Sequence, residues 1–282
     1  MSSSPSSAVQ TARRALGQRL KEMRQPTGMT ARAFAARAGW SESKASRIEN
    51  GKTSPSDADL CAYAELCGTP EAYADLLATA HGIEGMYIEW RRLQRAGMRH
   101  AQQAHVPLYE RTEHFRIYEP GVIPGILQTR DYARAIMGTI SAFRKLPDDV
   151  DAAVAVRMRR QHVLQDAGRR FGIVLEEAAL RARFGDAEVM AAQLGHLLSI
   201  ASLPQVSLGI VPFTAERRMW PLEAFWIFDG EQVLIELATA QVTVRQPSEI
   251  ETYARMFSAL ASIARFGKDA RALIAEATRA LG

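Results

Sequence analysis

Short helices separated by turn residues are predicted along the first 80 residues. Apolar side chains recur at positions i, i+4 and i+7 of the first segment, at Leu16, Leu20 and Met23. This periodicity predicts a helix from Thr11 to about Arg24, because Pro26 disfavours helical backbone in the residue before it. The Ser-rich residues 1–10 offer almost nothing to bury and are predicted to form a disordered tail.

Residues that begin and end helices punctuate the rest of this region. Four further helices are predicted: 31–38 after the N-cap Thr30, 42–49 after the N-cap Ser41, one from Pro55-Ser56 onwards, and one over Glu71 to Thr79. Gly39 separates the second helix from the third. Two short helices joined by a tight glycine-containing turn make a helix-turn-helix, so an all-α domain is predicted over 11–80.

The charge is unevenly divided along the chain. Residues 1–55 carry ten basic and three acidic side chains, a net charge of +7, whereas the whole chain of 282 residues carries +4 and the remainder therefore −3. A basic head on a mildly acidic body is typical of a nucleic-acid-binding domain attached to a separate effector domain. No apolar run approaches the roughly 18 residues that span a membrane, so no membrane partner is predicted.

The third helix has one apolar side and one polar side. Ala45 and Ile48 are expected to face the second helix, and the opposite arc would enter the major groove of DNA with Glu42, Ser43, Lys44, Ser46 and Arg47. Arg47 can fork onto guanine, Glu42 can accept from cytosine, and Lys44 and the serines suit base edges or phosphate. Further DNA contacts are assigned to flanking residues, Thr30, Arg32, Ser41 and Lys52, of which all but Ser41 suit phosphate. A merely solvated polar face is the alternative, which the tandem pattern and the basic background disfavour.

The head contains the stretches Leu16-Gly-Gln-Arg-Leu-Lys-Glu-Met-Arg and Met29-Thr-Ala-Arg-Ala-Phe-Ala-Ala-Arg-Ala-Gly-Trp-Ser-Glu-Ser-Lys-Ala-Ser-Arg-Ile-Glu-Asn-Gly-Lys. Over about fifty residues they resemble the lambda-repressor-like (XRE) family of helix-turn-helix regulators. Ala31 departs from that family, in which many members carry Gln at the start of the second helix. The resemblance also implies that Glu49 pairs with Arg24, a structural contact that sets the angle between the first and third helices.

Beyond residue 80 the pattern changes from helical to mixed. Helices are predicted over a charged connector (81–106), through Tyr109 and Phe115, after the N-cap Thr129, over Asp151 to Gln165, over Ala187 to Ala201, and twice after Pro247. Strands are predicted over Phe171 to Glu176, Gln205 to Pro212, Glu223 to Phe228 and Gln232 to Leu237. The first two flank a helix, which favours a parallel crossover, and Asp229-Gly230 predicts a hairpin between the last two. Residues 107–282 are therefore predicted to form an α/β domain with a small mixed sheet.

The body contains Val122-Ile-Pro-Gly-Ile-Leu-Gln-Thr-Arg-Asp-Tyr-Ala-Arg-Ala, Arg157-Met-Arg-Arg-Gln-His-Val-Leu, Glu177-Ala-Ala-Leu and Val189-Met-Ala-Ala-Gln-Leu-Gly-His-Leu. These stretches resemble the effector domain of actinobacterial XRE regulators, often called WhiJ-like or antitoxin-like. The resemblance implies an architecture for the whole body and, as a partner class, a small protein encoded nearby.

Motifs that carry catalytic chemistry are missing from the sequence, which contains no HExxH, GxSxG, GxGxxG or P-loop. We therefore expect neither an enzyme nor a cofactor. The six histidines show no ligand spacing, and Cys61 and Cys67 lie about 240° apart on one predicted helix, so neither a metal site nor a disulfide is expected. Low cysteine usage and an N-terminus without an apolar stretch predict a cytoplasmic protein.

The sequence thus predicts a sequence-specific DNA-binding transcriptional regulator that acts as a homodimer on an inverted-repeat operator. Two alternatives concern the body. One is an antitoxin-like protein that neutralises a small partner and autoregulates its operon. The other is a small-molecule-gated repressor with a ligand pocket among three aromatic residues, Trp220, Phe225 and Trp226.

Overall fold

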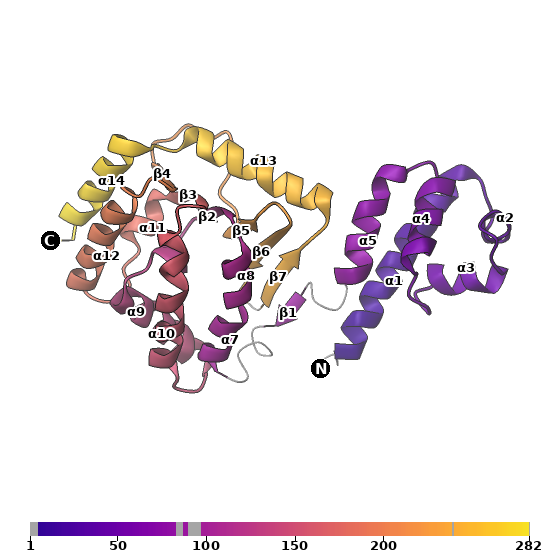
Figure 1. Ribbon diagram of the computed structural model, residues 1–282, viewed down its shortest axis with the longest axis horizontal. Coiled ribbons are helices and arrows are strands. Elements are labelled where there is room, and N and C mark those ends of the chain that lie inside the picture. The colour runs from indigo at the N-terminus through magenta and orange to yellow at the C-terminus, as the bar shows by residue number, and fades with distance from the viewer. Residues whose placement is uncertain (1–4, 83–86, 90–96, 239, 282) are drawn as a thin grey trace. The chain divides into compact units, whose positions relative to one another are not determined.

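The computed structural model describes residues 5–82, 87–89, 97–238 and 240–281, and the chain divides into two compact units (Figure 1). The first unit contains the chain up to Tyr87 together with Val244–Glu249, and the second contains the remainder. An N-terminal helical domain followed by an α/β domain is the predicted fold class, and the structure confirms it.

The first unit is built from short helices with side-chain caps. Its elements are α1 (Pro5–Arg24), the 3-10 helix η1 (Gln25–Thr27), α2 (Ala31–Arg37), α3 (Glu42–Glu49), α4 (Asp57–Leu66), the 3-10 helix η2 (Pro70–Ala72) and α5 (Tyr73–Gly82). As predicted, the Thr30 hydroxyl accepts from the Ala33 amide at 3.1 Å, and the Ser41 hydroxyl accepts from the Lys44 amide at 3.2 Å. Each cap satisfies an amide that has no partner within its helix.

Helix α1 begins at Pro5, six residues before the predicted start, so residues 5–10 are helical and the prediction of a disordered tail over them is wrong. Proline is well suited to the first turn of a helix, where its missing N–H has no partner to lose. Extending an existing helix costs little compared with nucleating one, so the apolar face from Leu16 onwards can support the residues that precede it.

The core of the first unit joins all of its longer helices. It consists of buried Leu16, Leu20, Phe34, Ile48, Leu60, Tyr63 and Leu76. The Phe34 and Tyr63 rings stack with their centroids 4.3 Å apart. Helix α1 crosses the end of α3 at Gly17, where an added Cβ would lie 2.5 Å from the Ile48 carbonyl oxygen. The absence of a side chain at Gly17 therefore allows α1 to approach α3 closely enough to hold its orientation.

The chain forms a sheet with the strand order β1-β7-β6-β5-β2-β3-β4. The strands are β1 (Tyr87–Glu89), β2 (His114–Glu119), β3 (Arg170–Glu176), β4 (Val206–Val211), β5 (Phe225–Phe228), β6 (Gln232–Glu236) and β7 (Ala240–Val244). Strands β2, β3 and β4 are parallel, whereas β5 runs antiparallel to both β2 and β6. The predicted parallel crossover and hairpin are confirmed, and the hairpin turn has positive φ angles at Asp229 (52°) and Gly230 (76°).

Helices connect and cover these strands. They are α7 (Met98–Ala104), α8 (Val106–Arg111), η3 (Gly125–Leu127), α9 (Arg130–Arg144), α10 (Val150–Arg160), η4 (Gln161–Gln165), α11 (Glu177–Arg181), α12 (Ala187–Ile200), α13 (Pro247–Ile263) and α14 (Gly267–Arg279). Thr129 caps α9 as predicted, its hydroxyl accepting from the Tyr132 amide at 3.3 Å.

Two predictions for the start of the body are wrong. Phe115 lies in the central strand β2, not in a helix, because alternate side chains of His114–Glu119 are buried on opposite faces of the sheet. The connector 81–106 contains strand β1 as well as helices, and its residues 83–86 and 90–96 lie outside the described residues. Strand β7 and helix α11 were not predicted.

The two faces of the sheet are covered by different helices. One face carries Phe115, Ile117, Phe171, Ile173, Leu208, Ile210, Trp226 and Phe228, which pack with residues of α8, α9, α12 and α14. The other face is covered by α13: its Tyr253 ring lies 5.0 Å from that of Phe225, and its Phe257 ring lies over Gly172. Among the described residues, no helix is long and apolar enough to cross a membrane.

Candidate functional site

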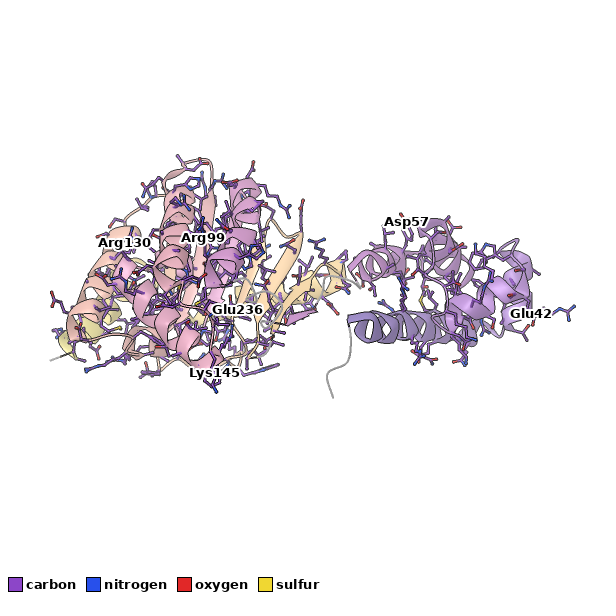
Figure 2. All side chains as sticks on the ribbon, turned by 90° about the horizontal axis from the view of Figure 1, so that it is seen from below. Glu42, Asp57, Arg99, Arg130, Lys145 and Glu236 are labelled. Carbon is purple, nitrogen blue, oxygen red and sulfur yellow. The ribbon has the colours of Figure 1, made fainter. Side chains whose placement is uncertain are left out.

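The predicted DNA-contacting arc of α3 lies on the surface of the first unit. Ala45 and Ile48 are buried against the core, at 0% and 1% exposure. The opposite side exposes Glu42, Ser43, Ser46 and Arg47, and Figure 2 labels Glu42 at the start of the helix. The structure therefore brings four of the five predicted arc residues together on one exposed face.

Lys44 is the member of the arc that differs. Its ammonium lies 2.5 Å from the Asp59 carboxylate and 4.3 Å from the centroid of the Trp40 ring. Burial alone would raise the pKa of Asp59, but the hydrogen bonds from Lys44 and Ser56 together outweigh it, and the pKa lies below its usual value. Lys44 thus pairs with α4 in this structure, and the predicted contact to a base edge or phosphate would require it to leave Asp59.

The flanking candidates divide into caps and free side chains. Thr30 and Ser41 use their hydroxyl oxygens as helix caps, although both residues are exposed. Arg32 and Lys52 are exposed at the start of α2 and just after α3. The structural pair is confirmed: Arg24 Nε lies 2.6 Å from Glu49 Oε1, and both residues are 7% exposed.

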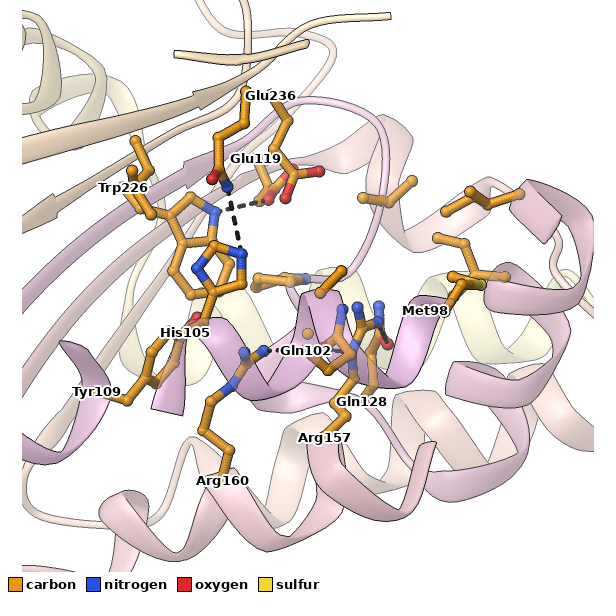
Figure 3. Close-up of a pocket in the computed structure, with 18 of the residues that line it drawn as sticks. Met98, Gln102, His105, Tyr109, Glu119, Gln128, Arg157, Arg160, Trp226 and Glu236 are labelled. Carbon is orange, nitrogen blue, oxygen red and sulfur yellow. Dashed lines mark hydrogen bonds between the residues drawn. The ribbon is translucent and has the colours of Figure 1, made fainter. Parts of the chain in front are cut away.

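A second candidate site is a cavity of about 130 Å³ inside the second unit (Figure 3). It lies between strands β2, β5, β6 and β7 on one side and helices α7 to α10 with the loop before α9 on the other. Its apolar lining includes Met98, Ile136, Ile140 and Leu234. Its polar lining includes Gln102, Glu119, Gln128, Arg157, Arg160 and Trp226.

The structure does not bring the three predicted pocket aromatics together. Only Trp226 lines this cavity. Phe225 is its neighbour on β5 and therefore points to the opposite face of the sheet, where it packs between Tyr118 and Tyr253. Trp220 is 63% exposed. The prediction of one pocket among the three is thus wrong, because adjacent strand residues cannot share a face.

Two arginines of α10 enter the cavity from the helix side (Figure 3). Arg157 donates from Nη1 to Gln128 Oε1 at 2.5 Å and from Nε to Gln102 Oε1 at 3.2 Å. Arg160 places its guanidinium 4.2 Å from the centroid of the Tyr109 ring and donates from Nη2 to Gln102 Oε1 at 3.4 Å. Burial lowers the pKa of Arg157 to about 10, and the charge of Arg160 acts in the same direction.

The cavity is also lined by a carboxyl group on the sheet side and by the imidazole of His105, at the junction of α7 and α8. Glu119, at the end of β2, accepts a hydrogen bond from Trp226 Nε1 at 3.0 Å. Its burial raises its pKa to about 8, so it is mostly protonated at neutral pH. Burial and the two arginine charges lower the pKa of His105 to about 3, so its ring is neutral. Neither group brings a full charge to the cavity at pH 7.

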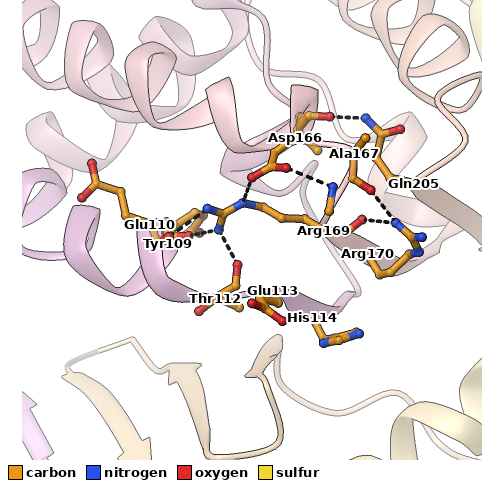
Figure 4. A network of polar contacts seen from close by, with 12 residues as sticks. Tyr109, Glu110, Thr112, Glu113, His114, Asp166, Ala167, Arg169, Arg170 and Gln205 are labelled. Carbon is orange, nitrogen blue, oxygen red and sulfur yellow. Dashed lines mark hydrogen bonds and ion pairs between the residues drawn. The ribbon is translucent and has the colours of Figure 1, made fainter.

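The position of Tyr109 depends on Arg169, which caps the end of helix α8 (Figure 4). The Arg169 guanidinium donates to the carbonyl oxygens of Tyr109 and Glu110, each at 2.8 Å, and to that of Thr112. Its Nε donates to Asp166 at 2.9 Å. A cation that hydrogen-bonds the last carbonyls stabilises a helix end, so Arg169 holds α8, and with it the wall of the cavity.

The sequence contains a signal for Arg157 and Arg160 that the prediction did not use. Ala153, Arg157 and Arg160 follow the i, i+4, i+7 spacing of one helix face, and Ala153 is fully buried. Arginines on an apolar face point into the protein, whereas Arg159, on another face, is exposed. The structure adds that a Cβ at Gly125 would lie 3.2 Å from the Arg157 guanidinium, so the glycine leaves room for this side chain.

Comparison with known protein families gives one match for each part of the chain. Residues 15–77 match the family described as helix-turn-helix domain. Residues 102–276, more than half of the chain, match the family described as domain of unknown function (DUF5753). The chain belongs to the DUF5753 family. No curated protein matches it.

The DUF5753 domain contains nearly the whole cavity. Of the lining residues, only Met98 and Ala101 precede the matched region. The helix-turn-helix match contains α2, α3 and every predicted DNA-contacting residue. Among the described residues, no group of three or more His, Cys, Asp and Glu side chains is placed to hold a metal, and Cys61 and Cys67 are both free thiols.

Proposed function

We propose that this protein is a sequence-specific DNA-binding transcriptional regulator of the lambda-repressor-like (XRE) class, acting in the cytoplasm. The observation that carries the proposal is the exposed arc of α3, in which Glu42, Ser43, Ser46 and Arg47 face away from a fully packed core. The helix-turn-helix match covers this arc. In such domains the second helix of the motif enters the major groove, where exposed polar side chains can reach base edges.

The roles of the arc residues follow from their chemistry. Arg47 presents a planar fork of donors that matches the O6 and N7 acceptors of guanine, and Glu42 can accept from the amino group of cytosine. Arg32 and Lys52 lie outside the arc, where phosphate contacts would position the helix without reading sequence. The cap hydroxyls of Thr30 and Ser41 can still donate to phosphate, since the caps use them only as acceptors.

A homodimer is the second part of the proposal. One helix-turn-helix module of this size rarely gives specific affinity at physiological salt, whereas two modules related by a two-fold axis read two half-sites. We assign the dimer contact to the DUF5753 domain, because residues 102–276 carry 20 basic and 21 acidic side chains and so have no net positive charge to attract DNA. The predicted operator is an inverted repeat.

The test is a binding-site selection with the full chain and with Arg47→Ala. The wild-type chain should enrich one inverted repeat. Arg47→Ala should bind that site more weakly by about 1–3 kcal/mol and should lose its preference at one base pair of each half-site. No enriched sequence for the wild-type chain would contradict the proposed function, whereas an unchanged preference for Arg47→Ala would contradict only the role of that residue.

Gating by a small molecule is a second candidate function for the body, and the cavity with the buried Arg160 and the half-buried Arg157 favours it. A compound that binds the cavity and weakens DNA binding would support this function. The antitoxin-like alternative predicts a different result, which is co-purification of a small protein encoded by a neighbouring open reading frame.

A further inference from the structure

The cavity of the DUF5753 domain is lined by three arginines, and two of them, Arg157 and Arg160, project from α10. Arg160 is 6% exposed, and its buried Nη1 has no hydrogen-bond partner. The amide oxygens that accept from Arg157 and Arg160 belong to neutral Gln102 and Gln128. Among the described residues, no carboxylate lies within ion-pair distance of either guanidinium. Buried charges without an opposite charge are costly, which makes this wall of the cavity a site for an anion.

The carboxyl groups that line the cavity do not act as counterions for Arg157 and Arg160. Glu119 hydrogen-bonds to Trp226 on the sheet side, and its burial keeps it mostly protonated at pH 7. Glu236, the other acidic residue of the lining, is exposed and forms no ion pair with Arg157 or Arg160, although its charge raises the pKa of Arg157. The neutral imidazole of His105 is engaged with Gln241, at 3.4 Å between their side-chain nitrogens.

The size and lining of the cavity limit what can enter. A volume of about 130 Å³ is close to that of an engineered protein cavity, about 150 Å³, that binds benzene. The apolar side chains of Ile136, Ile140 and Leu234 suit a small hydrocarbon body. Arginine forks match carboxylates in two parallel hydrogen bonds, a geometry that also fixes the orientation of the ligand.

We propose that this cavity binds a small organic carboxylate, with the anionic group on Arg157 and Arg160 and a benzene-sized apolar body against Ile136, Ile140 and Leu234. The open Nη1 of Arg160 becomes a donor to the carboxylate, and Gln102 and Gln128 hold the two guanidiniums in place before the ligand arrives. The site is independent of the DNA-binding face, so its test needs no DNA.

The test uses the full chain and three probes that share a phenyl ring: benzoate, benzamide and the cation benzylamine. Calorimetry and thermal melting at pH 7 should show that benzoate binds and raises Tm, that benzamide binds about tenfold more weakly or worse, and that benzylamine does not bind. Phenylacetate and butyrate, each compared with its own amide, extend the test to ligands with other apolar groups. If no carboxylate binds more tightly than its matched amide, the proposal is wrong.

Variants of α10 assign the binding to the cavity. Arg160→Met keeps an unbranched, largely apolar side chain and removes the guanidinium with its charge, so it should weaken benzoate binding about tenfold or more while leaving the free chain folded. Arg159→Met is the matched control, because Arg159 is an exposed arginine of the same helix. Equal benzoate affinity in wild type, Arg160→Met and Arg159→Met would overturn the proposal.

Arg160→Lys covers the case in which Arg160→Met does not fold. Lysine keeps the charge and loses the planar fork, so benzoate should bind more weakly than to wild type, and the discrimination against benzamide should persist. If Arg160→Lys binds benzoate as tightly as wild type does, and prefers benzoate to benzamide by the same ratio, the assignment of the carboxylate to Arg160 is wrong.

Discussion

Arg24 and Glu49 join the last residue of α1 to the last residue of α3 through two parallel hydrogen bonds. Arg24 Nε donates to Glu49 Oε1 at 2.6 Å, and Nη2 donates to Oε2 at 2.9 Å. The Tyr63 hydroxyl also donates to Glu49 Oε1, at 3.2 Å, which ties α4 to the same carboxylate. The Glu49 carboxylate therefore helps to fix the orientation of α3 and of its exposed arc, together with the close approach of α1 at Gly17.

Glu49→Ala is therefore expected to destabilise the first unit by about 3 kcal/mol. The substitution leaves the Arg24 guanidinium buried with the Met29 carbonyl oxygen as its remaining hydrogen-bond partner. Hydrogen exchange of the full chain should show faster exchange in α1 and α3. Glu65→Ala, at an exposed glutamate of α4, is the control and should change stability by less than about 0.5 kcal/mol. Equal exchange in the two variants would mean that the Arg24–Glu49 pair contributes nothing.

Lys52→Ala is expected to weaken binding to all DNA sequences by a similar factor. Lys52 is exposed beyond the end of α3, where a phosphate contact carries no base information. Affinities measured over a salt series should give a slope shallower by about one unit than that of wild type, because one fewer counterion is released. A change in sequence preference, with the slope unaltered, would place Lys52 at a base edge.

The dimer proposal predicts half-sites about 34 Å apart, one turn of DNA, arranged as an inverted repeat. Light scattering of the full chain, with and without a DNA duplex, should give the mass of two chains on one operator. Destroying one half-site by base changes should weaken binding strongly, since both heads contribute to the affinity. A monomer that binds a single half-site with full affinity would contradict the dimer and favour the partner-neutralising function.

Glu119→Gln is expected to change how stability depends on pH. Burial raises the pKa of Glu119 from its usual 4.5 to about 8, so between these values the folded chain keeps a proton that the unfolded chain releases. Wild-type stability should therefore fall, relative to Glu119→Gln, as pH rises from about 4.5 to about 8, and the difference should level off above that.

Thermal melting of both chains at pH 5, 7 and 9 measures this difference. Glu113→Gln, at an exposed glutamate just before β2, should follow the wild-type profile. If Glu119→Gln and Glu113→Gln follow the same profile, Glu119 is ionised in the folded protein and the neutral state assigned to it is wrong.

Most of the first unit was predictable because its signals are local. The caps at Thr30 and Ser41 act on amides three residues away, and the turn at Gly39 depends on that residue's own φ of 70°. The Arg24–Glu49 pair spans 25 positions, yet the resemblance to a known family implied it, and the structure confirms it. The pairing of Lys44 with Asp59, which takes Lys44 out of the predicted DNA-contacting arc, was not predictable, because Asp59 lies on the next helix.

Strand β2 could not be predicted from local sequence signals. The alternation of His114–Glu119 is short and follows helix α8 directly, so a continued helix was an equally consistent interpretation. Its identity as the central strand comes from pairing with β3 and β5, which lie more than fifty residues downstream.

The sequence by itself determined the helix-turn-helix, the basic head, the hairpin at Asp229-Gly230 and the α/β character of the body, because each of these depends on local residue patterns or on composition and not on contacts between distant segments. The cavity was decided only by the tertiary structure. It joins Glu119 on β2, Arg160 on α10 and Trp226 on β5, and no periodicity relates positions so far apart. Whether a buried arginine has a counterion depends on which side chains surround it, and only the packing of sheet and helices decides that.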